Sequence, residues 1–469
     1  MNFDRGVFLF SGLVAVCGLA LTCTVQAMQT DATYPLTAVN DTQTPPNNAL
    51  QDVPMGQSSS GQASLLPEDA AGSKVDNVFG RQGGYFHPYI TIQEALTDNV
   101  YNIKTDRVSS WVTTVSPGMW FALPRKKEIP VAITPHNTSP GGLQYQFKDH
   151  EGTDRVQAYL LGGLDFINYS GNSNLNTTNG DLEGLLRYNM PSGLSLQIVD
   201  RYTLGENAPE YKNQAATENY KSNFSLATID WKMTEKLRSK LEYSNFLLNY
   251  DKTQYTFQNR VDNGFDFYQY YVYSEKTSFF IEDKYLVLRY DETTGSANNN
   301  SQNFIYGGIK WDTTEKLSLM AKVGQQKRNF DNNGGGVRTD YNGLAADLQA
   351  VYRPTIKTRL DFDLYRTNEE TDDLTASDKT VVGATFGYRQ KFNDKVSGSC
   401  DVTYENAEYR ELIPQQRTDN RIFIRPAVQY LFREWLMGEI AYEYDKRDST
   451  NDLYGYYSNT ILFNLKFAL

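Results

Sequence analysis

The chain has 469 residues, a formal net charge of −11 and a mean hydropathy of −0.55. An acidic balance argues against a nucleic acid as a partner, because the phosphate backbone attracts basic surfaces. After residue 27 no stretch approaches the roughly 18 apolar residues that a membrane-spanning helix needs, so helical spans are excluded.

The first 27 residues have the pattern of a secretory signal peptide. Arg5 supplies the basic start, residues 6–21 form an uncharged stretch, and residues 25–27 (Val-Gln-Ala) form a small-residue cleavage site. An uncleaved membrane helix is the less favoured alternative, because the apolar stretch is short for a span. Cleavage leaves Cys400 as the only cysteine, so we expect no disulfide within the mature chain.

Residues 28–85 are expected to form a disordered periplasmic linker. They contain five prolines and a run of three serines at 58–60, and no Lys or Arg precedes Lys74. The segment has no hydrophobic periodicity, so it lacks the apolar surface that a packed domain has to bury.

From residue 86 to residue 469 apolar and polar residues alternate in short runs. Residues 360, 362 and 364 are Leu, Phe and Leu, whereas residues 359, 361 and 363 are Arg, Asp and Asp. A period of two is the pattern of a strand with two different faces. The runs predict an all-β protein whose residues 86–469 form a transmembrane antiparallel β-barrel. We count 18 strands, with 16 as the alternative, and an even count places the start of the first strand and the end of the last strand both on the periplasmic side.

Short polar turns preceded by an aromatic residue recur about every forty residues along the barrel region. The turn at Trp231–Leu237 is repeated at Trp311–Leu317, for example. Longer loops rich in Asn, Asp, Gly and Thr lie between these turns, as at residues 331–338 and 368–377. This alternation is typical of outer-membrane barrels, whose short turns lie in the periplasm. In residues 122–154 we expect a periplasmic excursion or two additional short strands.

The last nine residues predict the strand that closes the barrel. Ile461, Phe463, Leu465, Phe467 and Leu469 fall on one face, and mainly polar residues fall on the other. In a barrel the apolar face of this strand meets lipid. The spacing looks like the C-terminal assembly signal of outer-membrane proteins, in which the final residue is usually Phe rather than Leu.

Charged residues on the polar faces of the strands are expected to line a lumen, because each would cost about 2–4 kcal/mol in the middle of a bilayer. The residues that this reasoning assigns to the lumen are Arg238, Lys240, Glu242, Lys322, Arg359, Asp361, Asp363, Asp401, Glu405, Glu439, Glu443, Asp445 and Lys466.

No catalytic, cofactor-binding or metal-binding set of residues is predicted. The three histidines all lie within the first 150 residues, and Cys400 falls on the apolar face of its strand. The tyrosine-rich run Phe265–Tyr273 is interpreted as strand and membrane-interface residues, with sugar stacking on lumenal tyrosines as the alternative.

Two elements carry a resemblance to a known family. The run 94–101 (Glu-Ala-Leu-Thr-Asp-Asn-Val-Tyr), with Thr97-Asp98-Asn99-Val100 at its centre, and the Pro117-Gly118 pair resemble the opening of a family of outer-membrane β-barrel porins. Its members are often encoded in exopolysaccharide biosynthesis clusters, and the resemblance extends more loosely over residues 86–469. It implies a barrel that lets a secreted polysaccharide cross the outer membrane together with a periplasmic export complex. Outer-membrane lipid, lipopolysaccharide and the barrel assembly machinery are further expected partners.

Two other functions stay open. One is a general diffusion porin for small solutes, a class that usually has a loop folded into the lumen. No loop in this sequence is conspicuously long enough for that role. The other is a barrel enzyme acting on envelope polymers, with pairs such as Asp361 and Asp363 or Glu439 and Glu443 as hydrolytic carboxylates.

Overall fold

The computed structural model describes most of the chain from residue 85 onward. The described ranges are 85–123, 131–135, 143–147, 155–207, 218–251, 253–291, 298–314, 316–331, 338–371, 376–411 and 417–468. The predicted signal peptide, nearly all of the predicted linker and Leu469 lie outside these ranges. Within them, no helix is both long and apolar enough to cross a membrane.

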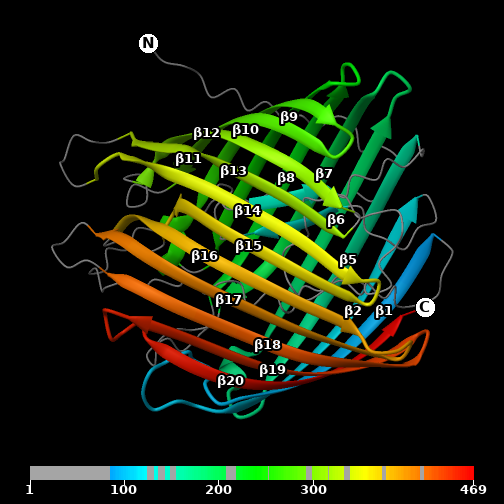
Figure 1. The fold of residues 1–469 in the computed structure, drawn as a ribbon. Coiled ribbons are helices and arrows are strands. Elements are labelled where there is room, and N and C mark those ends of the chain that lie inside the picture. Colours follow the sequence, from blue (N-terminus) through cyan, green and yellow to red (C-terminus); the bar gives the residue numbers. More distant parts are fainter. Residues whose placement is uncertain are drawn as a thin grey trace, which may run out of the picture. The chain divides into compact units, whose positions relative to one another are not determined.

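Almost all of the described residues belong to β-strands (Figure 1). Two short 3₁₀ helices, η1 (Ser173–Leu175) and η2 (Thr253–Gln258), lie in connections between strands. The strands are β1 (Phe86–Thr97), β2 (Ser110–Leu123), β3 (Val131–Pro135), β4 (Leu143–Phe147), β5 (Val156–Tyr169), β6 (Thr177–Asn189), β7 (Leu194–Asn207), β8 (Glu218–Lys232), β9 (Leu237–Tyr250), β10 (Arg260–Ser274), β11 (Thr277–Tyr290), β12 (Asn300–Thr314), β13 (Leu317–Phe330), β14 (Tyr341–Thr355), β15 (Thr358–Glu369), β16 (Ala376–Lys391), β17 (Val396–Glu411), β18 (Thr418–Arg433), β19 (Leu436–Ser449) and β20 (Tyr456–Ala468).

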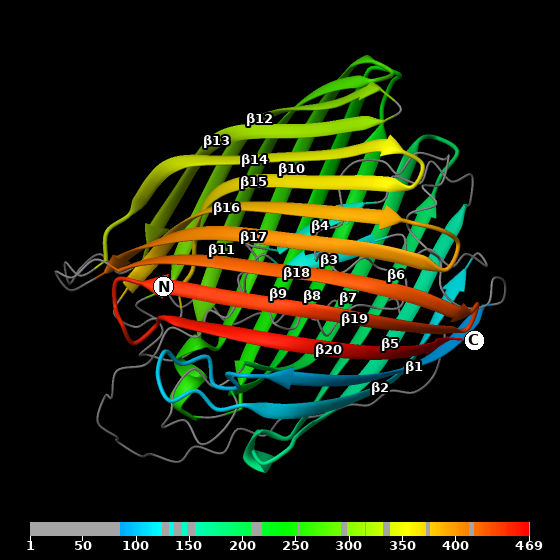
Figure 2. The ribbon, with the colours of Figure 1, turned by 60° about the horizontal axis from the view of Figure 1, so that its bottom comes forward.

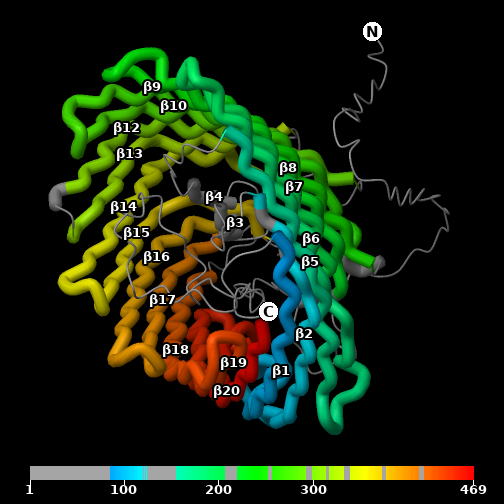
Figure 3. Tube along the Cα trace, turned by 90° about the vertical axis from the view of Figure 1, so that its right-hand side faces the viewer, coloured from blue at the N-terminus to red at the C-terminus, as the bar shows by residue number. Residues whose placement is uncertain are grey.

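Eighteen of these strands form one closed antiparallel ring. Successive strands pair with each other, β2 pairs directly with β5, and β1 pairs with β20 from Tyr89 opposite Ala468 to Thr97 opposite Thr460. Figure 2 shows the first strands, in blue, beside the last, in red, and Figure 3 shows the ring of strands. The predicted 18-stranded barrel, starting near residue 86, is confirmed. Closing the ring satisfies the backbone groups that a sheet edge would leave unpaired.

The two remaining strands form a separate small sheet. β3 and β4 pair antiparallel, from Val131 opposite Phe147 to Pro135 opposite Leu143. These are the two additional short strands that the sequence offered as an alternative within residues 122–154. They do not add to the barrel count, because neither pairs with a strand of the ring.

Short turns and longer loops alternate as predicted. The short turns include those between β8 and β9 and between β12 and β13, where the Trp231 and Trp311 repeats lie. In the turn from β6 to β7, Gly193 has φ of 80°, a conformation that glycine adopts without steric cost, and Met190 N donates to Leu194 O at 2.8 Å. We call the barrel end with these turns, the start of β1 and the end of β20 the short-turn end, and the opposite end the long-loop end.

The Thr97-Asp98-Asn99-Val100 element fastens the first strand to the last. The Asp98 carboxylate accepts hydrogen bonds from the backbone N–H and the side-chain amide of Asn459, each at 2.8 Å. Asn99 Nδ2 donates to Tyr457 O at 2.8 Å, and Arg107 Nη1 lies 2.8 Å from the Asp98 carboxylate. The element that carried the family resemblance therefore stabilises the seam at which the barrel closes.

Candidate functional site: the inner wall of the barrel

The strand register gives the barrel two faces of different chemistry. On β20, Ile461, Phe463 and Leu465 are exposed, whereas Leu462 and Asn464 are buried. Directly opposed residues of neighbouring strands point to the same side of a sheet. We call the face with the exposed apolar residues the outer face, and the opposite one the inner face. The predicted orientation of the closing strand agrees with this arrangement.

Aromatic residues mark the outer face near the short-turn end. Trp231, Trp311, Tyr352 and Tyr430 lie just before their turns and are 41–45% exposed. Their amphipathic rings suit a boundary between hydrocarbon and water. The aromatic residue that the sequence places before each turn thus belongs, at these four turns, to an interfacial belt.

The outer face is not apolar throughout. Asp283 lies opposite Phe267 and Ile305, which are 45% and 53% exposed, and it accepts a hydrogen bond from Asn303 Nδ2 at 2.9 Å. Asp200 has a similar outer position and accepts hydrogen bonds from neighbouring Ser and Asn side chains. Asp200 and Asp283 were not among the predicted lumen-lining residues, and they show that a charged strand residue can also lie on the outer face, because alternation alone does not reveal how far along a strand the bilayer extends.

All of the residues predicted to line the lumen lie on the inner face. Asp361 illustrates the pattern, since it lies between the outer-face residues Leu360 and Phe362. The same register argument applies to Arg238, Lys240, Glu242, Lys322, Arg359, Asp363, Asp401, Glu405, Glu439, Glu443, Asp445 and Lys466. Their participation in transport is part of the proposal below.

On β15 to β17 the inner-face charges form a continuous chain of ion pairs. Arg359 Nε lies 2.9 Å from one Asp361 oxygen, and Arg389 Nη1 lies 3.0 Å from the other. Arg389 Nη2 also lies 3.1 Å from Asp401. Each carboxylate is therefore held by guanidinium groups, which fix its position.

The chain of charges continues on β18 to β20 around Arg425. Its Nη2 lies 2.9 Å from Glu439 and its Nε 3.0 Å from Glu443. Glu439 also accepts hydrogen bonds from Gln429 Nε2 at 2.5 Å and from Asn464 Nδ2 at 2.9 Å. We call the inner face of β15–β20 that carries these residues, together with Lys466, the charged wall.

A second inner-face cluster, on β9 to β13, combines charges with aromatic rings. Lys240 Nζ lies 3.0 Å from Glu242 and 3.9 Å from the centre of the Tyr268 ring. Lys322 Nζ lies 2.9 Å from Glu282 and 4.6 Å from the Tyr306 ring. Both lysines thus combine an ion pair with a cation–π contact.

The tyrosine-rich run Phe265–Tyr273 supplies both faces of β10. Phe265, Phe267 and Tyr271 are 44–51% exposed on the outer face, whereas Tyr268 and Tyr270 point inward and stack on each other with ring centres 5.9 Å apart. The strand interpretation of this run is confirmed, and two of its tyrosines belong to the inner wall.

The C-terminal end of β15 separates from β14 and folds against the inner face of the barrel. Its pairing with β14 ends at Arg366 opposite Ala346, while its pairing with β16 continues to Glu369 opposite Lys379. Residues 367–371, which we call the inward segment, then contact inner-face residues of β12 and β13 rather than β14.

Glu370 anchors the inward segment. Its carboxylate lies 2.7 Å from Arg328 Nη1 and accepts a hydrogen bond from Gln302 Nε2 at 2.7 Å. Next to it, Asn368 exchanges backbone hydrogen bonds with the Gln326 side chain, with Asn368 N donating at 2.8 Å and Asn368 O accepting at 2.6 Å. Arg328 and Gln326 are both fully buried.

The inward segment corrects the expectation about loops. The sequence offers no loop long enough to fold into the lumen, yet a segment reaches the inner face without a long loop. A bend at the end of a strand moves the following residues inward, so loop length alone does not predict which segments contact the inner face.

Several charged inner-wall residues were missed in the sequence. Arg389 lies near the end of β16, which continues to Lys391. Arg425, Asp266 and Glu282 lie on the polar sides of strands, and extending the alternation to β10, β11 and β18 would have found them.

Two kinds of site considered from the sequence, a metal site and a pair of hydrolytic carboxylates, can be compared with the structure. Within the described ranges, no group of three or more His, Cys, Asp or Glu side chains is placed to hold a metal ion. The acids Asp361, Glu439 and Glu443, considered as hydrolytic carboxylates, are ion-paired with arginines.

Comparison with solved structures shows similarity to outer-membrane proteins. Pseudomonas aeruginosa OccK2 (OpdF) is 9% identical, with 82% of this chain and 99% of that chain covered and a TM-score of 0.44. The outer membrane protein opdK of Pseudomonas aeruginosa is 10% identical over 82% and 99% of the chains, with a TM-score of 0.42. The siderophore receptor PirA of Acinetobacter baumannii is 8% identical over 83% and 81%, with a TM-score of 0.41. No curated protein matches the sequence.

A family model assigns the chain more directly. The model described as "Putative beta-barrel porin 2" matches residues 153–469. The match begins after the Thr97-Asp98-Asn99-Val100 element, so that element lies outside it. It covers β5 to β20 and with them the charged wall. The chain therefore belongs to the Putative beta-barrel porin 2 family and is a β-barrel porin of the outer membrane.

Proposed function

We propose that this porin conducts a secreted exopolysaccharide across the outer membrane, in concert with a periplasmic export complex. The family resemblance at residues 94–118 motivates the choice of substrate. Outer-membrane lipid and lipopolysaccharide surround the barrel in this proposal, and the barrel assembly machinery inserts it.

The observation that carries the proposal is the mixture of groups on the inner wall. Hydroxyl-rich polymers form hydrogen bonds with carboxylates, guanidinium groups and amides, and their rings stack on aromatic side chains. The charged wall supplies the first kind of group, and Tyr268, Tyr270 and Tyr306 supply the second. Many weak contacts of this kind let a hydrated chain bind and leave at each position.

Deletion of the gene tests the proposal in the producing cell. We expect polysaccharide to be synthesised but to remain absent from the cell surface, and a plasmid copy should restore it. Unchanged surface polysaccharide in the deletion strain would contradict the export function. In planar bilayers, soluble oligosaccharides should interrupt the ion current through the purified barrel.

The second candidate is a channel for small hydrophilic solutes. The inward segment favours it, because Glu370 and Asn368 bring a fixed element against the inner face, as constricting elements of diffusion porins do. A deletion strain that retains surface polysaccharide but takes up small solutes more slowly would support this candidate over export.

A further inference from the structure

A row of polar side chains crosses the outer face of β7 to β10. The register places Asp200 opposite Ser225, Ser225 opposite Asn245, and Asn245 opposite Asn263. Ile198, two positions before Asp200 on β7, is 55% exposed, so this side of the strands is the outer face. We call Asp200, Ser225, Asn245 and Asn263 the outer polar row.

The side chains of the outer polar row form hydrogen bonds along the face. Ser225 Oγ donates to one Asp200 oxygen at 2.5 Å, and Asn223 Nδ2 donates to the other at 3.1 Å. Asn245 Nδ2 donates to Asn263 Oδ1 at 3.0 Å. Asp200 is exposed, and within the described ranges no Lys or Arg forms an ion pair with it. Each oxygen of its carboxylate therefore keeps the capacity to accept a further hydrogen bond from outside the barrel.

The Asp200 end of the row lies within the apolar band of the outer face. On β8, Ser225 is six residues from the belt residue Trp231, or roughly 20 Å along the strand at about 3.3 Å per residue. A strand tilt of about 35–45° reduces this to roughly 15 Å along the membrane normal, and such a band is about 25 Å tall. Leu182 and Tyr202 are exposed and lie nearer the long-loop end than Asp200. Apolar residues therefore lie on both sides of the carboxylate.

Lipid chains are a poor environment for this carboxylate, because they offer no hydrogen-bond donor. Polar side chains at such depths are costly when they face lipid, and they commonly mark contacts or pathways. Gly184 and Ser225 flank Asp200 on the neighbouring strands, and small residues let another protein approach closely. The outward carboxylate of Asp283 is instead flanked by two large apolar side chains. The outer polar row thus has the properties of a protein contact.

We propose that the outer polar row is an interface at which a second copy of this porin binds. Copies in one membrane are related by an axis along the membrane normal, so each residue lies at the same depth in both. An axis that passes between β7 and β8 brings Asp200 of each copy next to Ser225 of the other. The serine hydroxyl and the neighbouring amides supply the donors that lipid lacks. The inference depends on the outer-membrane location of the porin and not on the solute that passes.

Cross-linking of the purified porin in liposomes tests the interface, in a background in which Cys400 is Ser. Ser225→Cys should give a covalent dimer with a short thiol-reactive cross-linker, because the two thiols lie near the axis. Val402→Cys is the matched control, since it also faces outward and lies a similar number of residues from the short-turn end, and it should stay monomeric. Heat-modifiable migration on a gel verifies that both variants are folded. Equal dimer yields, or no dimer from Ser225→Cys, would overturn the proposal.

Substitution of Asp200 gives an independent test through the equilibrium between monomer and dimer. Asp200→Leu should weaken association about ten-fold, as measured by energy transfer between singly labelled copies at increasing ratios of lipid to protein. Asp283→Leu also removes an outward carboxylate and should leave the association unchanged. A natural porin that is monomeric at every ratio, or equal losses in the two variants, would contradict the proposal. Neither test involves transport, so its result is separate from that of the gene deletion.

Discussion

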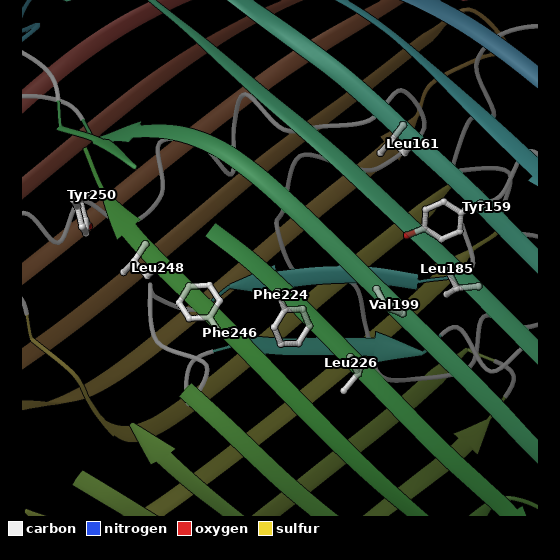
Figure 4. Packing of buried hydrophobic residues seen from close by; sticks show 9 residues of the cluster. All are labelled: Tyr159, Leu161, Leu185, Val199, Phe224, Leu226, Phe246, Leu248 and Tyr250. Atoms are coloured by element: carbon white, nitrogen blue, oxygen red, sulfur yellow. The ribbon is translucent and has the colours of Figure 1, made fainter. Parts of the chain in front are cut away.

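Two regions of the barrel's inner face bury different kinds of side chain, charged in one and apolar in the other. The charged wall on β15–β20 neutralises buried charges with one another, as Arg425 does with Glu439 and Glu443. The inner face of β5–β9 instead carries what we call the inner apolar patch, whose buried members are Tyr159, Leu161, Leu185, Val199, Phe224, Leu226, Phe246, Leu248 and Tyr250 (Figure 4). Both walls alternate with an apolar outer face. The contrast shows that an inward position does not by itself decide whether a strand residue is charged or apolar.

The largest expected loss of stability comes from placing a charged side chain in the inner apolar patch. Leu226→Asp places a carboxylate in the inner apolar patch, opposite the fully buried Val199. Loss of the leucine packing alone destabilises a core by about 2–5 kcal/mol, and an unpaired buried charge adds to that cost. Urea unfolding of the refolded barrel measures the change.

The control for this substitution is Leu226→Met, which conserves volume and should cost less than about 1.5 kcal/mol. A Leu226→Asp barrel that unfolds at the same urea concentration as the natural protein would show that the patch is hydrated, and the contrast between the walls would disappear.

A smaller loss of stability is expected from Arg425→Ala in the charged wall. The substitution leaves Glu439 and Glu443 without their shared guanidinium, and hydrogen bonds to charged groups contribute about 1.5–3 kcal/mol each. Arg425→Lys should recover only part of the loss, because an ammonium group lacks the planar fork. Unfolding midpoints measure both variants, and equal stability of Arg425→Ala and the natural protein would refute the paired arrangement.

Ion selectivity should change when the acids of the charged wall are neutralised. Glu439→Gln with Glu443→Gln leaves Arg425 and Lys466 as net positive charge, so the reversal potential under a salt gradient should move toward anion preference. Asp283→Asn on the outer face is the matched control and should leave the reversal potential unchanged. A shift in the control as large as that in the double variant would contradict the assignment of the two faces.

The smallest effect is expected for an ion pair outside both walls. Lys104 Nζ lies 2.5 Å from Asp452 across the seam, and its hydrogen bond lowers the pKa of the Asp452 carboxyl. A lowered pKa in the folded state contributes stability above the ordinary pKa of the carboxyl, and the contribution is lost as the pH falls through the lowered pKa. Both side chains are exposed, so the pair should matter little to unfolding.

An NMR titration of the Asp452 carboxyl in the natural protein and in Lys104→Ala measures this effect. The pKa of Asp452 should rise toward its ordinary value in the variant, and an unchanged pKa would show that the lysine does not engage the carboxylate in solution.

Much of the fold was accessible from the sequence, because a period of two is a local property of the chain. The alternation at residues 359–364 and 461–468 predicted which residues face outward, and the spacing of the turns predicted the strand count. The assignment of charges to the inner face followed from the cost of a charge in hydrocarbon.

The same local signal failed where both faces of a strand are apolar. Leu160 is 52% exposed and its neighbour Leu161 is 7% exposed, and nothing in the sequence distinguishes them. Which of the two leucines faces outward is set by the register of β5 with β2 and β6. The inner apolar patch, built from five strands, was therefore invisible before those strands were aligned.

What the sequence determined by itself is the period of the strands, the short-turn pattern and the class of residue that meets lipid. Only the tertiary structure decided which charges pair, where β15 leaves β14 to carry Glu370 to Arg328, and how the Asp98 carboxylate holds the last strand. The physical reason is the distance along the chain between the residues that interact. Alternation is fixed by neighbouring residues, whereas the contact of Asp98 with Asn459 joins residues 361 positions apart and exists only once the ring has closed.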